Sequence, residues 1–295
     1  MLTRAATAFI DPHPAALLVE TNLGDGAYTE ALLNAAPQAQ ILAFELDPDA
    51  VRRAAQFLGP RFAQVRVFQT SFGNLERELT AIGVFGRVDG LVCDPGLSSK
   101  QARGPFGFSF QTEGPLRMTY DPGAPVTAAD LVNTSSAADL AAIFEGGDVP
   151  PRDARKVADA IVERRKRQPL GTTTDLVEAI VAALGRTQEG KRHVATRYFL
   201  GLRLAATGEM AELDRALPQM LSCLKVGGVG VLLAYHGGES RMQRQFLQQY
   251  KQRKHDSDGP RLEVLTKDPV RPDREEIRRN PAARSALLRA FRRVA

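Results

Sequence analysis

Cysteine and histidine, the residues that most often build metal sites and covalent cross-links, are scarce in this chain of 295 residues. Its only cysteines are Cys93 and Cys223, which both fall in apolar stretches. Two such cysteines exclude a disulfide framework and a cysteine-based metal site, and they favour a reducing compartment. The four histidines, at positions 13, 193, 236 and 255, lack the spacing of metal ligands. We therefore expect no metal site.

Long hydrophobic runs are also missing. No apolar run approaches the roughly 18 residues of a membrane span, and no secretory hydrophobic segment opens the chain. The first nine residues hold one arginine and no acid, which is also compatible with a remnant of a mitochondrial leader. A hydrophobic content of 43% and a charged content of 25% indicate a globular protein with a sizeable core. The length suits one large domain or a domain with an insertion.

Acidic residues are fewer than basic ones, so the net charge is +5. The basic residues are distributed unevenly along the chain. Basic residues gather in 163–167, in 241–254 and towards the end of the chain, in 278–293. Clusters of this kind are either solvated surface or contacts to nucleic acid, and charge alone does not decide between the two.

Residues 16–35 have the pattern of a buried strand, a turn containing Gly24 and Gly26, and a helix from Thr29 to Ala35. This layout lets the backbone approach a nucleotide-like ligand at the carboxyl end of a parallel sheet. An ordinary turn that uses glycine for its positive φ is the alternative. A second strand over 41–45 ends in Glu45, about 20 residues after the glycines, where Rossmann-like folds place the acid that binds ribose hydroxyls. A charge at the start of the next helix, 49–58, is the competing interpretation for the acids near this position.

A third strand over 65–69, a helix over 75–82 and a fourth strand over 88–94 continue the alternation, which is typical of a doubly wound parallel sheet. The fourth strand ends in Asp94 and Pro95, similar to the acid–proline signature of amino-directed methyltransferases. A conjugated amine is a poor nucleophile, and acceptors such as a carboxylate and a fixed carbonyl would localise its lone pair and aim it. Proline would hold that carbonyl still and add no N–H group. Alternatively, Asp94 caps the following helix.

From residue 100 the alternation stops. An aromatic, glycine-rich loop over 103–110 precedes mostly helical patterns over 127–206, with capping boxes at Thr127 and Thr172. We expect a long helix over 196–213, a helix over 217–224, a glycine turn at 227–228, a strand up to residue 236, strand material at 262–266 and a basic tail. The predicted fold is α/β, a Rossmann-like doubly wound sheet with an inserted, mainly helical domain. The predicted boundaries are 1–104 with 205–295 for the sheet domain and 105–204 for the insertion.

At this point nearly the whole chain resembles one family, the small-subunit rRNA cytosine-N4 methyltransferases (RsmH or MraW). Many short matches in the right order carry the resemblance: Val88–Ser99, Gly107–Phe110, Gly114–Leu116, Asp121–Pro122, Ala160–Arg164, Gln168–Pro169, Ala195–Arg197, Gly227–Gly228, His236 and Asn280–Ser285. The resemblance implies the fold of S-adenosylmethionine (SAM) methyltransferases, with SAM as the cofactor and a cytosine of small-subunit ribosomal RNA as the target.

Carried over from the family, the cofactor residues are Gly24, Gly26, Ala27, Tyr28, Glu45, Phe72, Asp94 and Gln101. Asp94 and the Pro95 carbonyl would accept hydrogen bonds from the cytosine amine. Phe106, Phe108 and Phe110 would stack the extruded base, since an enzyme that modifies a base takes it out of its stack. The RNA contacts are expected at Arg164, Arg165, Arg197, His236, Arg241 and Arg284.

The cofactor turn departs from the family pattern, since Ala27 replaces a glycine, Tyr28 replaces a histidine, and Glu45 stands for the usual aspartate. Two functions therefore stay open. One is SAM-dependent N4-methylation of a small-subunit rRNA cytosine, and the other is a non-catalytic family member that binds rRNA as a ribosome assembly factor. Either function has small-subunit rRNA and the small ribosomal subunit or its assembly intermediates as partners, and no membrane. We expect it at the site of ribosome assembly, in the mitochondrial matrix or the bacterial cytoplasm.

Overall fold

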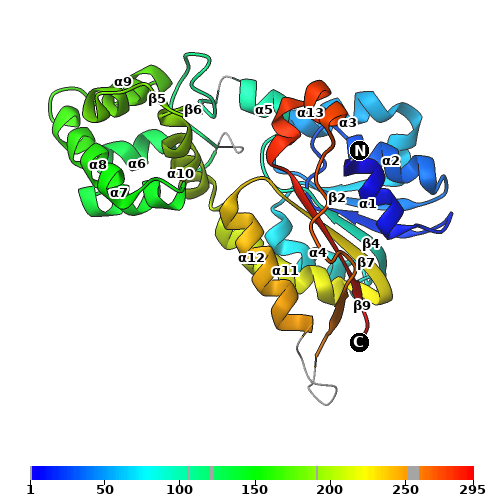
Figure 1. Ribbon diagram of the computed structural model, residues 1–295. Coiled ribbons are helices and arrows are strands. Elements are labelled where there is room, and N and C mark those ends of the chain that lie inside the picture. Colours follow the sequence, from blue (N-terminus) through cyan, green and yellow to red (C-terminus); the bar gives the residue numbers. More distant parts are fainter. Residues whose placement is uncertain (1, 105, 120–122, 191, 252–258) are drawn as a thin grey trace. The chain divides into compact units, whose positions relative to one another are not determined.

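The structure, a computed structural model, describes residues 2–104, 106–119, 123–190, 192–251 and 259–295. It divides into two compact units, one built from residues 1–96 and 210–295 and the other from residues 97–209 (Figure 1). The boundaries predicted from the sequence, 104/105 and 204/205, lie inside the second unit. Asp121 and Pro122, which take part in the resemblance, lie outside the described residues.

The first unit is built on a seven-stranded sheet of order β3-β2-β1-β4-β7-β9-β8. Its strands are β1 (Leu17–Glu20), β2 (Gln40–Phe44), β3 (Val65–Phe68), β4 (Val88–Cys93), β7 (Leu224–Ala234), β8 (Leu262–Val264) and β9 (Leu287–Arg293). The strands β3, β2, β1, β4 and β7 run parallel, and β9 is antiparallel to β7 and β8. The central strands are nearly continuous apolar runs because both faces of the sheet are covered. This is the predicted doubly wound, Rossmann-like architecture.

Helices cover both faces of this sheet (Figure 1). On one face, α1 (Leu2–Ile10), α2 (Ala27–Ala35) and α3 (Pro48–Leu58) share an apolar cluster with the sheet. The other face packs against α4 (Leu75–Ala81), α11 (Glu209–Cys223) and α12 (Gly237–Lys251). The first residues, weighed above as a leader remnant, thus form a helix with Leu2, Ala6 and Ile10 buried. The short elements η1 (Gly59–Gln64), η2 (Phe72–Asn74), α13 (Arg274–Arg279) and η3 (Pro281–Ser285) complete the unit.

Three predictions for the later part of the chain differ from the structure. The expected helix over 196–213 is split into α10 (Ala195–Thr207) and α11, because Gly208 adopts the left-handed conformation that ends a helix. The expected glycine turn lies inside β7, where Gly227 has φ +87° and the pairing with β4 shifts register, as in a β-bulge. The expected basic tail is in part the sheet strand β9, which is paired on both sides.

The second unit is mainly helical, as predicted. It contains α5 (Ser99–Arg103), α6 (Ala128–Thr134), α7 (Ala137–Gly146), α8 (Pro151–Arg165), α9 (Thr173–Leu184), α10 and the small hairpin of β5 (Gln188–Glu189) and β6 (Arg192–His193). Both predicted capping boxes form, at Thr127 with Asp130 and at Thr172 with Asp175. Its core gathers apolar residues of the helices with Phe108, Leu116 and Met118 of the preceding loop.

Three features bear on the classes of site considered above. Cys93 and Cys223 are both buried free thiols. In the described part of the chain, no three histidine, cysteine or acidic side chains are grouped so that they could hold a metal ion. None of the described helices combines the length and the apolar character needed to cross a membrane.

Candidate functional site at the carboxyl edge of the sheet

Four polar side chains lie where neighbouring parallel strands end. Glu20 ends β1, Glu45 follows β2, Asp94 follows β4 and Tyr235 follows β7. Because β2, β1, β4 and β7 are adjacent and parallel, their carboxyl ends share one edge of the sheet. Ligands of open α/β sheets bind at this edge. The first unit therefore has an acidic edge in the position of a ligand site.

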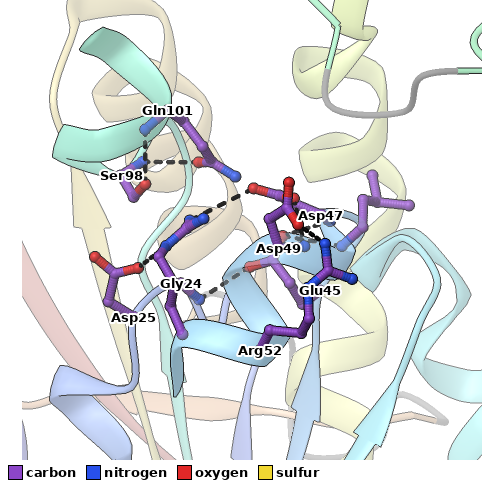
Figure 2. Close-up of polar contacts among 10 residues, drawn as sticks. Gly24, Asp25, Glu45, Asp47, Asp49, Arg52, Ser98 and Gln101 are labelled. Carbon is purple, nitrogen blue, oxygen red and sulfur yellow. Dashed lines mark hydrogen bonds and ion pairs between the residues drawn. The ribbon is translucent and has the colours of Figure 1, made fainter. Parts of the chain in front are cut away.

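The glycine turn between β1 and α2 is tied to the end of β2. Gly24 and Gly26 have φ values of +53° and +87°, so both positions need a residue that accepts the left-handed region. The Gly24 N–H donates to Glu45 Oε2 at 2.9 Å (Figure 2). Gly26 caps α2 without a side-chain hydrogen bond to the first turn. Those first N–H groups, at the positive end of the helix dipole, suit an anionic group of a ligand.

Glu45 is held by three backbone donors. Besides the Gly24 contact, its Oε1 accepts from the N–H groups of Leu46 at 3.0 Å and Asp47 at 2.9 Å. Asp47 caps α3 by accepting from the Asp49 N–H at 2.8 Å, so the helix-capping acid is Asp47 and not Glu45. Burial raises the pKa of Glu45, against the effect of these donors. A carboxylate offers about four acceptor positions, so a lone pair remains for a ligand hydroxyl.

Ala27 and Tyr28, the departures from the family turn, are the first two residues of α2 and differ in burial. Ala27 is exposed at the first position of the helix. The Tyr28 ring is buried in the apolar cluster that α1 and α2 form with the sheet. Burial first, and then the nearby negative charge of Asp94, raise the pKa of the Tyr28 phenol, which is therefore neutral. The bulk that replaces the family histidine thus belongs to the core of the first unit.

Glu20 is the most deeply buried acid of the edge, with 1% of its surface exposed. Its Oε2 accepts a hydrogen bond from the Thr29 hydroxyl, whereas Oε1 has no partner among the described residues. Burial raises the pKa of Glu20 to about 8, the Thr29 hydroxyl opposes the rise, and the charges of Asp94 and Glu45 add to it. A buried carboxyl oxygen of this kind calls for a partner, which a water molecule or a ligand can supply.

Glu20 should make the stability of the protein fall as the pH rises. Its folded pKa of about 8 lies above its ordinary value of 4.5, so the folded state holds this proton more tightly than the unfolded state does. The contribution of protonated Glu20 to the free energy of unfolding is fully present below about pH 4.5. It falls by up to roughly 1.4 kcal/mol per pH unit and is lost by about pH 8. We expect Glu20→Gln to flatten the pH dependence of the free energy of unfolding, measured by urea titration from pH 5 to 8.

The exposed Glu76 on α4 provides the matched control. Glu76→Gln makes the same chemical change at the surface, and the free energy of unfolding should depend on pH as it does in the wild type. An unchanged slope in Glu20→Gln would contradict the assignment of this titration to Glu20.

Asp94 is paired with a residue that sequence reasoning missed. The Tyr235 hydroxyl donates to Asp94 Oδ1 at 2.6 Å. Burial raises the pKa of Asp94 to about 7, the Tyr235 hydroxyl opposes the rise, and the charge of Glu239 adds to it. Pro95, next to it, is buried. The edge thus holds a carboxyl group that titrates near neutrality. The feature of the sequence that could have identified Tyr235 is its position directly after the strand that became β7.

Tyr235 is itself positioned by the start of α12. Its backbone N–H donates to Glu239 Oε2 at 2.6 Å, and Glu239 is 2% exposed. His236, a predicted RNA contact, has its Nε2 at 3.3 Å from Glu239 Oε1 and is largely buried. This turn fixes the loop that carries the tyrosine.

The other predicted cofactor residues are also placed. Phe72 begins η2 and is buried in the apolar cluster of α4, α11 and α12. Gln101 belongs to the second unit, where it forms a capping box with Ser98: its side chain accepts from the Ser98 N–H at 2.9 Å (Figure 2).

The predicted aromatic stacking residues lie with the core of the second unit. Phe108 is buried there, and Phe106 packs against the same cluster. The Phe110 ring is 4.9 Å from the His193 ring and 5.1 Å from the Phe199 ring, measured between centroids.

The predicted arginine contacts divide into two groups. Arg164 lies 3.0 Å from Glu178, Arg165 donates to the Val132 carbonyl at 2.9 Å, and Arg197 lies 3.5 Å from Glu189. Arg241 and Arg284 are exposed. The first three therefore have partners within their own unit.

The doubly wound sheet, the glycine turn after its first strand and the acid after its second define a Rossmann-like protein with a site for a nucleoside-type ligand. The comparisons with known proteins name the family. A sequence model of the MraW methylase family matches residues 1–294, and the chain belongs to this family. The resemblance found in the sequence is thus confirmed.

Three relatives of the chain from different organisms carry the same protein name. The ribosomal RNA small subunit methyltransferase H of Thermomicrobium roseum is 39% identical over 306 residues, covering 100% of this chain and 93% of its own. The protein of the same name from Syntrophobacter fumaroxidans is 40% identical over 288 residues, covering 92% and 88%. That from Coprothermobacter proteolyticus is 37% identical over 282 residues, covering 94% and 89%.

Proposed function

We propose that this protein transfers a methyl group from SAM to the N4 amine of a cytosine in small-subunit ribosomal RNA. The observation that carries the proposal is Asp94, an acid with a pKa of about 7 that stands with buried Pro95 at the carboxyl end of β4. Family membership supports methyl transfer, and the names of the relatives support small-subunit rRNA as the substrate. The partner is then the small ribosomal subunit or an assembly intermediate.

The residues of the edge fit SAM. The first N–H groups of α2 suit the carboxylate of its methionine part, and Glu45 suits the ribose hydroxyls. Glu20 and Asp94 present negative charge when ionised, which suits a sulfonium. Among the described residues, no group donates a hydrogen bond to Glu20 Oε1. When bound, SAM supplies an electrophilic methyl group.

The chain itself supplies orientation and charge. Ionised Asp94 would accept one N–H of the cytosine amine, and the Pro95 carbonyl would accept the other, so that the lone pair is directed at the methyl group. Tyr235 holds the Asp94 carboxylate in one orientation and favours its ionised form. The amine proton is lost late, and water or the Asp94 carboxylate accepts it.

The alternative function, a non-catalytic role in ribosome assembly, was considered because Ala27 and Tyr28 depart from the family pattern. In the structure the first side chain is exposed and the second is buried in the core, and neither observation favours that role.

Methyl transfer from labelled SAM to unmethylated small-subunit particles tests the proposal. We expect labelled N4-methylcytidine after nuclease digestion and mass spectrometry, and the same yield from the control Asp214→Asn, which alters an exposed acid of α11. Particles whose cytosine is already methylated should accept no label. Absence of transfer would contradict the proposal, and absence of heat in a calorimetric titration with SAM as well would support the assembly role.

A further inference from the structure

We propose that Arg289, Arg271 and Arg244, with the Ser240 hydroxyl, form a binding site for a backbone phosphate of RNA. The inference rests on the proposed function for the identity of the nucleic acid. All four residues belong to the first unit, and they come from β9, from the segment before α13 and from α12.

Arg289 lies on the face of β9 that packs against α12. Side chains alternate along a strand, and Phe291, two residues further, contacts Phe246 of α12 with ring centroids 5.8 Å apart. The intervening Ala290 and the preceding Leu288 belong to the cluster on the opposite face. Arg289 pairs in register with Leu232, near the carboxyl end of β7. The arginine is therefore close to the edge of the sheet that carries Asp94 and Tyr235.

The Arg289 guanidinium is only partly paired. Its Nη2 donates to Ser240 Oγ at 3.1 Å, whereas the buried Nη1 has no hydrogen-bond partner among the described residues. A buried guanidinium N–H without an acceptor is costly, so the site is completed when an acceptor binds.

Backbone geometry brings the other two arginines to the same place. Val270 exchanges hydrogen bonds of 2.9 Å with Leu288 in an antiparallel bridge, which puts the next residue, Arg271, on the same face as Arg289. Arg244 follows Ser240 by four residues, one turn along α12, and so shares its face. Both side chains are exposed, and their positive charges lower the pKa of Arg289 together with its burial, the larger cause.

Three arginines without a carboxylate define the ligand. Within the described parts of the chain, none of the three forms an ion pair, whereas arginines elsewhere do, such as Arg53 with Asp25 and Arg186 with Asp153. Guanidinium groups and a hydroxyl match the oxygens of a phosphate, which arginine binds in a bidentate manner. Because the site neighbours the edge where the target base would be bound, a phosphodiester close to that base is the fitting ligand.

The double variant Arg244→Gln/Arg271→Gln tests this site without changing Arg289. Binding of a fluorescent small-subunit rRNA fragment is measured by anisotropy at several salt concentrations. We expect about tenfold weaker binding, and a salt dependence of log K that is shallower by about one unit, because one phosphate contact is lost. SAM affinity and the melting temperature should match those of the wild type.

Arg87→Gln is the control, since Arg87 is exposed and precedes β4, at the opposite edge of the sheet. It should leave the rRNA affinity unchanged. Wild-type affinity and salt slope in the double variant would overturn the proposal, and so would an equal loss in Arg87→Gln. Calorimetric binding of inorganic phosphate that the double variant loses, with rRNA binding unchanged, would assign free phosphate instead and also overturn it.

The outcomes for the site and for the proposed function are separate. If the wild type transfers methyl groups and the double variant binds rRNA normally, the phosphate site is contradicted and the proposed function is supported. If the double variant binds rRNA more weakly but the wild type transfers no methyl group, the phosphate site is supported and the proposed function is contradicted.

Discussion

Asp94→Asn should lower kcat for methyl transfer about 100-fold or more at saturating SAM, while the protein stays folded. Asparagine keeps the shape of the side chain but offers one acceptor oxygen without charge, so the cytosine amine loses its ionised partner. Removal of one preorganised electrostatic contact typically costs a factor of about 10² to 10³ in rate. The measurement is the initial rate of labelled methyl transfer at saturating SAM and saturating small-subunit particles.

Tyr235→Phe separates the role of the carboxylate from that of its partner. The phenol donates to Asp94 at 2.6 Å and holds the pKa of Asp94 down, against the effect of burial. Without this donor the pKa rises, so Asp94 stays protonated to higher pH. A hydrogen bond to a charged group is worth about 1.5 to 3 kcal/mol, and we expect the rise of activity with pH to move up by about 1 to 2 units.

The two variants therefore differ in whether they respond to pH. Activity of Tyr235→Phe should recover near pH 9, whereas that of Asp94→Asn should stay low at every pH. Asp214→Asn, on the surface of α11, serves as the control for loss of one negative charge. Wild-type kcat in Asp94→Asn would contradict the role of Asp94, and an unmoved pH profile in Tyr235→Phe would contradict that of Tyr235.

Local patterns in the sequence were enough for the strands and glycine turn of the first unit from Leu17 to Asp94, although they did not predict α1. Each strand there is a short apolar run followed by a turn and a helix, and β1, β2 and β3 pair in sequence order, whereas β4 pairs with the more distant β1 and β7. Capping boxes at Thr127 and Thr172 were equally visible, because a cap depends on residues three positions apart.

The later strands depend on contacts that no local pattern contains. Gly208 ends a helix by adopting the left-handed region, yet a lone glycine is also tolerated within a helical pattern. The pair of glycines at 227–228 indicates a turn, but pairing with β4 and β9 draws them into β7. The arginine-rich end looks like a solvated tail because the pairing that makes it β9 comes from distant residues.

The site divides in the same way. Gly24 and Glu45 were found by their spacing, and the structure joins them by a hydrogen bond of 2.9 Å. Tyr235 lies 141 positions from Asp94 in the sequence, so only the assembled sheet brings their side chains together. Glu20 escaped notice because an acid at the end of a buried strand has meaning only when its burial is known.

Affinity for SAM should rise with pH, and that for S-adenosylhomocysteine should not. Glu20 and Asp94 have pKa values of about 8 and about 7 before a ligand binds, so both hold protons near neutrality. A sulfonium close to these acids favours their ionised forms and lowers both pKa values, so SAM binding releases protons. Binding linked to the release of one proton becomes up to about tenfold tighter per pH unit. We expect this rise between about pH 6 and 8.

S-adenosylhomocysteine is the matched ligand, because its sulfur carries no charge while its adenosine and amino acid parts are the same. Calorimetric titrations of both ligands, each in two buffers of different ionisation enthalpy, give the number of protons released. We expect release at pH 7 for SAM, much less for S-adenosylhomocysteine, and a smaller value for SAM with Glu20→Gln. Equal proton release by the two ligands would mean that the acids do not sense the sulfonium. The acidic edge would then serve the structure of the sheet, and the charge complementarity that connects Glu20 and Asp94 to methyl transfer would be lost.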